Sequence, residues 1–167
     1  MIQKTAYLSL GSNVGERRHN LERALERLEQ EQIHVVARSD IYETEPQDVP
    51  AQAWFLNMVV ECRTRCFPLQ LLAILQSIER EIGRVRGAGA VHRGPRIIDI
   101  DILLFGNVVM DTPQLSIPHP RMLDRRFVLE PLIEIAPDLK HAQTKQPLRK
   151  YLSDVAGQKV RKLAAHS

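Results

Sequence analysis

The residues best suited to chemistry lie in the stretch from Arg93 to Ile102, which reads RGPRIIDIDI. Its β-branched residues favour a strand, and because strand side chains alternate between faces, Asp99 and Asp101 would point the same way, with backbones about 6 to 7 Å apart. Two like charges on one face repel each other unless a positive group lies nearby. Mg²⁺ prefers one or two carboxylates together with waters and phosphate oxygens. The pair predicts a magnesium–nucleotide site, although a solvated edge strand is the alternative for the pair taken alone.

Arginines that precede this pair favour phosphate chemistry. They are Arg84, Arg86, Arg93 and Arg96, on a loop that also contains Gly87, Gly89 and Gly94. Guanidinium groups bind phosphate oxygens through paired hydrogen bonds and neutralise charge as a phosphoryl group is transferred. The glycines give the loop freedom to close over a ligand. Carboxylates for a metal beside arginines for phosphate predict phosphoryl transfer.

Two other phosphate-binding motifs are absent from the sequence. Residues 11–16 read GSNVGE, which lacks the Gly-Lys-Ser/Thr ending of a Walker A loop. The chain also contains no G-x-G-x-x-G, the fingerprint of dinucleotide-binding Rossmann folds. We therefore expect arginines and a metal to hold the phosphates.

Length and composition are typical of a single globular domain. The chain has 167 residues, of which 44% are hydrophobic and 26% charged, and we expect one domain over 1–167 with a basic tail at 158–167. A net charge of +3 is too small to indicate a nucleic-acid partner. Cys62 and Cys66 are expected to be reduced thiols. Without a signal pattern or a long apolar run, the sequence predicts a cytoplasmic protein that does not enter a membrane.

Periodicity and turn residues predict the elements that must position these groups. Strands are expected at Thr5–Leu10, Ile33–Thr44, Phe55–Arg63 and Ile97–Phe105, and helices after Gly15, with Leu21, Leu25 and Leu28 buried, and from Pro68 to Gly83. Gly106 and Asn107 predict a hairpin to Val108–Met110, and short helices are expected at Phe127–Ile135 and Leu148–Val155. This order predicts an α+β fold with a ferredoxin-like βαββαβ core, an antiparallel sheet, an added β-hairpin and C-terminal helices.

These residues resemble the 6-hydroxymethyl-7,8-dihydropterin pyrophosphokinase family, whose signature couples Gly-Pro-Arg to Asp-x-Asp at the spacing seen in residues 94–101. The resemblance continues in order up to about Val155. Its other motifs are YLSLGSN at 7–13, YET at 42–44, FLN at 55–57, GRVR at 83–86, PHPRM at 118–122 and FVLEPL at 127–132. The resemblance implies transfer of the β,γ-diphosphate of ATP to the pterin hydroxymethyl oxygen, with release of AMP and with two Mg²⁺ ions, in tetrahydrofolate synthesis.

The resemblance also implies roles for individual residues. Metal ligands are expected at Asp99 and Asp101, which with Arg84 and Arg96 form the expected catalytic set. Contacts to ATP are implied for Gln76, Glu79, Arg84, Arg86, Arg93, Ile102, Ser116, His119 and Arg125. Contacts to the pterin are implied for Gly11, Thr44, Glu45, Pro46, Phe55, Asn57, Arg96 and Phe127, with the two phenylalanines stacking on the ring and Thr44 and Asn57 reading its edge. Arg93 stands where the family often has tryptophan.

Several alternatives stay open. An RNA-binding module shares the βαββαβ order, but its central strands need exposed aromatics, and the sequence places Asp99 and Asp101 there instead. A non-catalytic domain that senses a small molecule is a third reading. The nucleophile could be activated by a metal-bound carboxylate such as Asp101 or by magnesium acting on the hydroxymethyl group. We expect a monomer that binds only small molecules.

Overall fold

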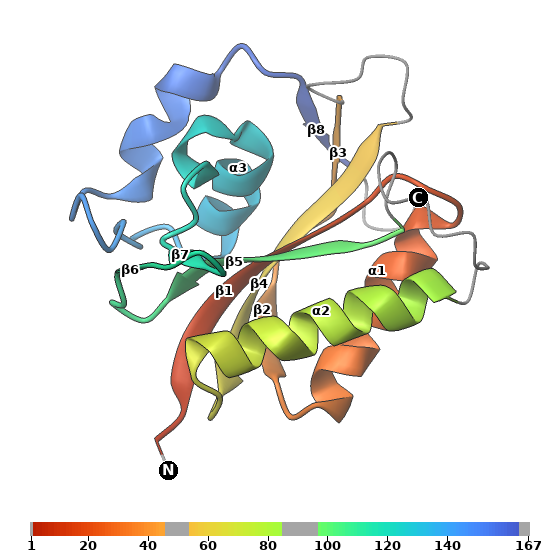
Figure 1. The fold of residues 1–167 in the computed structure, drawn as a ribbon. Helices are drawn as coiled ribbons and strands as arrows, with labels where there is room; N and C mark the ends of the chain where they lie inside the picture. The colour runs from red at the N-terminus through yellow and green to blue at the C-terminus, as the bar shows by residue number, and fades with distance from the viewer. Residues whose placement is uncertain (1, 46–53, 85–96, 164–167) are drawn as a thin grey trace.

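The computed structural model describes residues 2–45, 54–84 and 97–163, without the side chain of Arg84. The strands form a central sheet with helices packed around it (Figure 1). In order, the elements are β1 (Lys4–Ser12), α1 (Arg17–Gln30), β2 (His34–Arg38), β3 (Tyr42–Thr44), β4 (Phe55–Thr64), α2 (Pro68–Arg84), β5 (Asp99–Phe105), β6 (Met110–Asp111), β7 (Ser116–Ile117), the 3₁₀ helix η1 (Met122–Asp124), α3 (Arg126–Ile135), the 3₁₀ helix η2 (Leu148–Val155) and β8 (Val160–Lys162).

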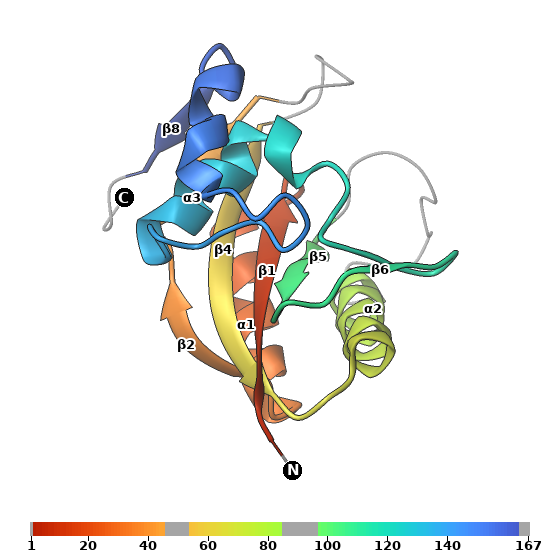
Figure 2. The ribbon, with the colours of Figure 1, turned by 90° about the vertical axis from the view of Figure 1, so that its left-hand side faces the viewer.

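One antiparallel sheet of six strands organises the molecule. Its order is β5-β1-β4-β3-β8, and β2 also pairs with β4. Helices α1 and α2 lie against one face, and α3 lies against the other (Figures 1 and 2). These features confirm the mixed class with an antiparallel sheet, while the finer ferredoxin-like assignment stays a prediction.

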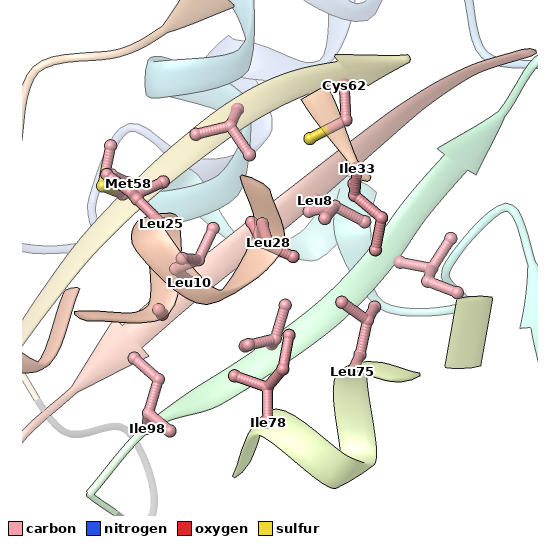
Figure 3. Packing of buried hydrophobic residues seen from close by; sticks show 14 of the residues in the cluster. Leu8, Leu10, Leu25, Leu28, Ile33, Met58, Cys62, Leu75, Ile78 and Ile98 are labelled. Carbon is pink, nitrogen blue, oxygen red and sulfur yellow. The ribbon is translucent and has the colours of Figure 1, made fainter. Parts of the chain in front are cut away.

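The main core fills the space between the sheet and the helix pair α1 and α2. Alternate residues of β1 point into it, namely Ala6, Leu8 and Leu10, each at most 1% exposed. Residues of β4, of the segment leading into β5 and of both helices complete it, and Figure 3 shows Met58, Ile98, Leu28 and Ile78 converging there. Because one face of β1 and β5 is committed to this core, the intervening residues point to the other face.

A second cluster covers only part of that other face. It joins Val59, Leu103 and Leu104 of the sheet to Leu129 and Leu132 of α3, all buried. The cluster extends into the C-terminal segment through η2. It leaves the neighbouring part of the sheet, around the ends of β1 and β4, for polar side chains.

The segment predicted as one strand from Ile33 to Thr44 forms two strands instead. Strand β2 ends at Arg38, where the register with β4 has already shifted between Val35 and Ala37. Ser39 then replaces a regular ladder contact, because its Oγ accepts from the Val59 N–H at 3.0 Å and its N–H donates to the Val59 oxygen at 2.9 Å. This kink redirects the chain into β3.

The predicted hairpin is also displaced along the chain. Gly106 has a φ of +52°, but its N–H donates to the oxygen of Thr5 at 2.8 Å, and Val108 starts no strand. The hairpin forms between β6 and β7 because the Thr112 hydroxyl closes the turn, donating to the Leu115 oxygen at 2.9 Å and accepting from its N–H at 3.0 Å.

The predicted basic tail is corrected as well. Residues Val160–Lys162 form β8, an edge strand that pairs with β3. The sequence did not indicate a strand here because Arg161 and Lys162 are charged, and their partners are acidic side chains distant in sequence. In the described ranges, no helix has the length and apolar composition needed to cross a bilayer.

Candidate active site

A pocket of about 280 Å³ opens on the sheet face that α3 leaves uncovered. Its volume lies near the lower end of the range for small-molecule sites, about 300 to 1,000 Å³, so it fits one small ring system and leaves a nucleotide to bind beyond it. Strands β1, β3, β4 and β5 all contribute residues to it. The described lining residues are Ser9, Gly11, Thr44, Glu45, Phe55, Asn57, Asp99, Asp101, Arg121, Arg125 and Phe127.

Asp99 and Asp101 both line this pocket, as strand alternation predicted. In the β1–β5 ladder Asp99 pairs with Gly11 and Asp101 with Ser9. The buried Asn20 of α1 fixes the approach to β5, since its Nδ2 donates to the Ser12 Oγ at 3.1 Å and lies 3.5 Å from the Ile97 oxygen. The two carboxylates are therefore positioned by the sheet and not by a loop.

The donor set of this pair fits magnesium. Among the residues that the structure describes, no group of three or more His, Cys, Asp or Glu side chains gathers as a closed metal cage. The side chain of Asp101 is 46% exposed, which leaves room for other oxygen ligands. Mg²⁺ is usually held by one or two carboxylates, with waters and substrate phosphates filling the remaining positions.

Glu79 of α2 supports the same strand from its open edge. Its Oε2 accepts a hydrogen bond of 2.8 Å from the N–H of Ile100, the residue between the two aspartates. Since β5 is the edge strand of the sheet, this N–H has no ladder partner on that side. Glu79, expected to contact ATP, thus holds the backbone that carries the carboxylates.

His119 lies beside Asp101, with 4.0 Å between its Nε2 and the Asp101 Oδ2. Burial lowers the pKa of the His119 imidazole below its usual value, the Asp101 carboxylate opposes this shift, and the guanidiniums of Arg125 and Arg121 add to it. Its Nδ1 accepts from the Arg121 N–H at 3.1 Å, so in the neutral ring the proton sits on Nε2. The ring therefore offers an N–H donor toward the carboxylate pair.

Two arginines give the rim of the pocket a positive charge. The guanidinium of Arg125 lies 5.5 Å from the centre of the Phe127 ring, within range of a cation–π contact. Arg121 also lines the pocket, although the sequence analysis assigned it no role. Its place in the PHPRM motif, two residues after His119, was the signal that could have identified it. Ser9 was missed too, since a small polar residue in a strand carries no distinctive signal.

The predicted edge-reading residues form one buried pair. Asn57 Nδ2 donates to the Thr44 Oγ1 at 2.6 Å, and the two residues are 6% and 3% exposed. Gly11 faces them across the ladder, and a Cβ there would lie 2.7 Å from Asn57 Oδ1 and 3.7 Å from Phe55 Cδ1. A glycine is needed at this position for the pocket floor to stay flat.

Phe55, Phe127 and Glu45 complete the predicted pterin set among the described residues, and all three line the pocket. Both phenylalanine rings are half-buried, so part of each ring is available to a ligand. Glu45 lies at the rim, where its Oε2 is 3.9 Å from the Lys159 Nζ. The structure thus brings together pterin-set residues that are separated by more than a hundred positions in the sequence.

Five of the predicted ATP contacts do not line the pocket. Two of them, Glu79 and His119, lie beside the aspartate pair, and the other three are Ile102, Gln76 and Ser116. Ile102 is 3% exposed and belongs to the core between the sheet and the helices, so only its main chain could reach a ligand. Gln76 is exposed on α2. Ser116 of β7 donates to the Asp111 Oδ1 at 3.0 Å. Four further predicted contacts, together with the Arg84 side chain, lie outside the described residues: Pro46, Arg86, Arg93 and Arg96.

The exposed aromatic platform of an RNA-binding module is missing where the sequence would have placed it. Tyr7 on β1 packs against the cluster formed by the sheet and α3. Its hydroxyl lies 3.3 Å from the Glu61 Oε1, and burial together with this carboxylate raises its pKa to about 12. A half-buried tyrosine that donates to a carboxylate is not a stacking surface for bases.

The chain matches a known protein family and several named proteins. Residues 7–137 match the family model described as 7,8-dihydro-6-hydroxymethylpterin-pyrophosphokinase. The chain is 46% identical over 144 residues to the 2-amino-4-hydroxy-6-hydroxymethyldihydropteridine pyrophosphokinase of Bacillus subtilis, covering 86% of this chain and 84% of that protein. It is 44% identical over 141 residues to the protein of the same name in Pseudomonas aeruginosa, with coverages of 84% and 85%.

Longer proteins are also similar to this chain. Over 159 residues it is 43% identical to the folic acid synthesis protein fol1 of Schizosaccharomyces pombe, covering 95% of this chain but only 21% of that protein. The crystal structure of Plasmodium falciparum HPPK-DHPS with pteroate has a TM-score of 0.71 at 18% identity, covering 92% of this chain and 42% of that one. At that identity the likeness concerns the fold alone.

Proposed function

Since this chain belongs to the 7,8-dihydro-6-hydroxymethylpterin-pyrophosphokinase family, we propose that it transfers the β,γ-diphosphate of ATP to the hydroxymethyl group of 6-hydroxymethyl-7,8-dihydropterin. The reaction releases AMP and serves tetrahydrofolate synthesis. The observation that supports it most is the position of Asp99 and Asp101 on the wall of a pocket whose floor is Gly11 and whose buried edge is Thr44 and Asn57.

The pocket suits a flat bicyclic ring with donors and acceptors along one edge. Gly11 keeps the floor free of a side chain, and Phe55 and Phe127 offer aromatic faces for stacking. The Thr44–Asn57 pair supplies polar atoms fixed by their own hydrogen bond, so they lose little freedom when a ligand binds. The hydroxymethyl group would then point toward β5 and its carboxylates.

Asp99 and Asp101 would hold magnesium together with the phosphates of ATP, and we expect two ions. Bound there, magnesium would neutralise charge on the transferring phosphates and make the hydroxymethyl oxygen easier to deprotonate. The chain itself would keep the two aspartates apart and aligned through the β1–β5 ladder and through Glu79. Because the pocket fits only one small ring system, the nucleotide base would bind outside it.

In the reaction the hydroxymethyl oxygen forms a bond to the β-phosphorus, while the bond from that phosphorus to the oxygen shared with the α-phosphate breaks, and AMP leaves. The hydroxyl proton passes to the Asp101 carboxylate or to water. The Nε2–H of His119 and the guanidiniums of Arg121 and Arg125 would donate to phosphate oxygens as charge shifts toward AMP. Most of the catalytic effect is thus positioning and charge neutralisation.

We also propose that four arginines and the main chain of Ile102 help to bind ATP. Arg84, Arg86, Arg93 and Arg96 would cover the phosphates once the pterin is bound, with Arg93 adding a phosphate contact. Ile102 would contribute to ATP binding through its main chain, since its side chain is in the core. We further propose that the protein works as a cytoplasmic monomer.

The direct test is AMP release by the full chain from ATP and MgCl₂, with and without 6-hydroxymethyl-7,8-dihydropterin. AMP that forms only in the presence of the pterin, in a one-to-one ratio with pterin diphosphate, supports the proposal. Production of ADP, or of AMP independently of the pterin, contradicts it. A folded protein that binds the pterin without turnover would favour the non-catalytic sensing reading.

A further inference from the structure

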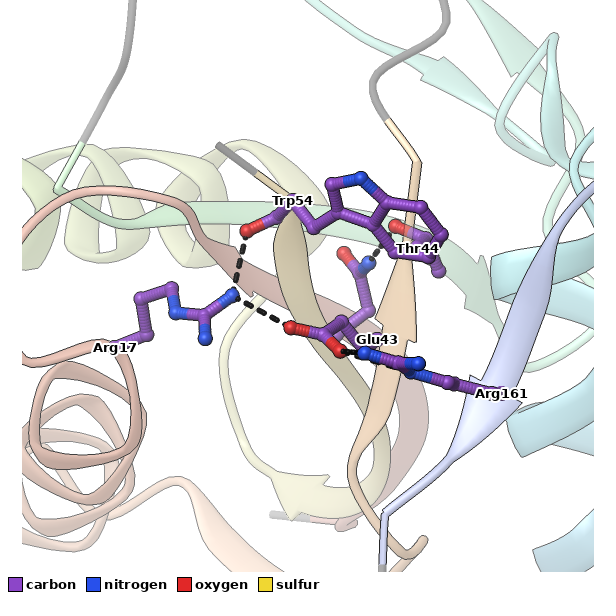
Figure 4. A network of polar contacts seen from close by, with 6 residues as sticks. Arg17, Glu43, Thr44, Trp54 and Arg161 are labelled. Atoms are coloured by element: carbon purple, nitrogen blue, oxygen red, sulfur yellow. Dashed lines mark hydrogen bonds and ion pairs between the residues drawn. The ribbon is translucent and has the colours of Figure 1, made fainter. Parts of the chain in front are cut away.

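A polar network links α1, β3 and β8 (Figure 4). Strand alternation places its acidic residue, Glu43, on the sheet face opposite to its pocket neighbour Thr44. The centre of the network is Glu43, the middle residue of β3, whose side chain is only 12% exposed. Arg17, at the start of α1, donates from Nη1 to the Glu43 Oε2 at 3.1 Å. From the other side, Arg161 of β8 donates to the Glu43 Oε1 from Nε at 2.9 Å and again from its Nη2.

The same arginines also hold Trp54, the residue before β4. Arg17 Nη1 donates to the Trp54 oxygen at 2.7 Å. The guanidinium of Arg161 lies 5.3 Å from the centre of the Trp54 ring, as a cation–π contact. Arg17, Glu43, Trp54 and Arg161 are called the Glu43 network below. It joins α1, β3, β8 and the start of β4.

Each end of the network is one residue away from a pocket residue. Glu43 precedes Thr44, and Trp54 precedes Phe55. Because successive strand residues point to opposite faces, a side chain held on the reverse face fixes the direction of its neighbour on the pocket face. Thr44 in turn accepts the hydrogen bond that orients Asn57.

We propose that the Glu43 network is a positioning device for pterin recognition, with Arg161 as a positioning residue outside the pocket. The proposal rests on the proposed function, since it assigns a role in binding the same pterin. Arg161 is not among the described residues that line the pocket, and the network would reach the ligand through Thr44 and Phe55. Strand β8 therefore contributes to the pterin site, although no site residue was predicted in this strand.

Lys162, the next residue of β8, offers a matched control. It points to the other face of the strand, where its Nζ lies 3.3 Å from the Asp40 Oδ2 and 3.6 Å from the Glu134 Oε1. Removing its charge breaks two ion pairs of the same strand, while Glu43 and Trp54 keep their partners. If a loosened β8 were enough to weaken pterin binding, changes at Arg161 and at Lys162 would both weaken it. The proposal instead predicts weaker binding only when Arg161 is changed.

Steady-state kinetics of the full chain test whether the Arg161 and Lys162 variants differ in this way. For Arg161→Gln we expect the KM for the pterin to rise about threefold to fivefold, because a partly exposed ion pair contributes modestly. The kcat and the KM for ATP should stay within about twofold of the wild-type values. Lys162→Gln should leave all three constants near wild type. Arg161→Lys should give an intermediate KM, since it keeps the charge but not the paired contact or the planar stacking.

Trp54 adds a spectroscopic measurement, because it is the single tryptophan of the sequence. Its emission in the ligand-free protein should change in Arg161→Gln and stay unchanged in Lys162→Gln. Equal KM values for the two variants, or an unchanged pterin KM in Arg161→Gln despite altered emission, would overturn the proposal while leaving the proposed function intact. A wild-type protein that neither binds nor converts the pterin would instead remove the proposed function, and this inference with it.

Discussion

Gly11 on β1 and Asn57 on β4 face each other across the ladder so closely that a Cβ on Gly11 would lie 2.7 Å from the Asn57 Oδ1. Real Cβ atoms do not approach an oxygen at that distance, so any side chain at position 11 must displace the amide. Asn57 is fixed from its other end by the 2.6 Å hydrogen bond to Thr44. The two polar atoms and the flat floor of the pocket therefore depend on this single glycine.

Gly11→Ala is expected to weaken pterin binding strongly. The added methyl group pushes the Asn57 amide away from Thr44, and a lost buried hydrogen bond costs about 1 to 3 kcal/mol, which corresponds to a KM increase of about fivefold to 150-fold. Kinetics with varied pterin concentration measure it. Gly157→Ala is the control, since nothing lies within 4 Å of its added Cβ, and equal losses in both variants would contradict the steric explanation.

Glu79→Ala should reduce AMP formation even though Glu79 does not line the described pocket. The substitution removes the acceptor of the Ile100 N–H and loosens the strand segment between the two aspartates. We expect a loss of about 1 to 2 kcal/mol in transition-state stabilisation, or about fivefold to thirtyfold in kcat/KM. Glu79→Gln, which keeps an oxygen acceptor, should retain more activity.

The matched control for this strand support is Glu81→Ala on the same helix. Glu81 pairs with Arg27 on α1 and is 47% exposed, so its removal affects the contact between α1 and α2 and leaves β5 unchanged. Activity near wild type in Glu81→Ala, together with the loss in Glu79→Ala, supports the role of Glu79 at the strand edge. Similar losses in both variants would show that helix packing is the cause.

Glu43 should make the stability of the fold depend on acid pH. Hydrogen bonds from Arg161, followed by those from Arg17, lower the pKa of its carboxyl below the usual value of 4.5. Because the folded-state pKa is the lower one, the stabilisation is present above about pH 4.5 and is lost as the pH falls toward the folded-state value. Glu43→Gln should lower the free energy of unfolding by about 1 kcal/mol at pH 7.

Urea unfolding at several pH values between 3.5 and 7 measures this effect. The difference in unfolding free energy between the wild type and Glu43→Gln should shrink as the pH falls below about 4.5. A difference that stays constant with pH would mean that the charge of Glu43 contributes nothing, and that only its shape is needed.

The aspartate pair shows how far the sequence could lead. Alternation alone placed Asp99 and Asp101 on one face, and the isoleucines between and beside them on the other, and the structure confirms both. The helix from Pro68 was equally readable, because its leucines and isoleucines repeat at helical spacing and its start carries a proline. These features depend on neighbours within a few residues, which is why one sequence suffices.

Features set by distant partners were not readable in the same way. Strand β8 is stabilised by Glu43, which lies more than a hundred positions before Arg161, so its own residues looked like a charged tail. Arg121 gains a place in the pocket because the turn after β7 brings it beside His119, and apart from its place in the PHPRM motif nothing in the sequence indicated this. The break at Ser39 depends on its bonds to Val59. None of these contacts leaves a periodic signal.

The measurement closest to the central claim is pterin-dependent AMP formation as a function of MgCl₂ concentration, in the wild type and in Asp99→Asn and Asp101→Asn. Asparagine keeps the shape of aspartate but removes the charge that would hold magnesium. We expect each variant to lose at least about a hundredfold in kcat/KM with unfolding free energies near wild type, and excess chelator to abolish wild-type turnover. Variants as active as the wild type, or turnover that survives the chelator, would contradict a magnesium site on this aspartate pair.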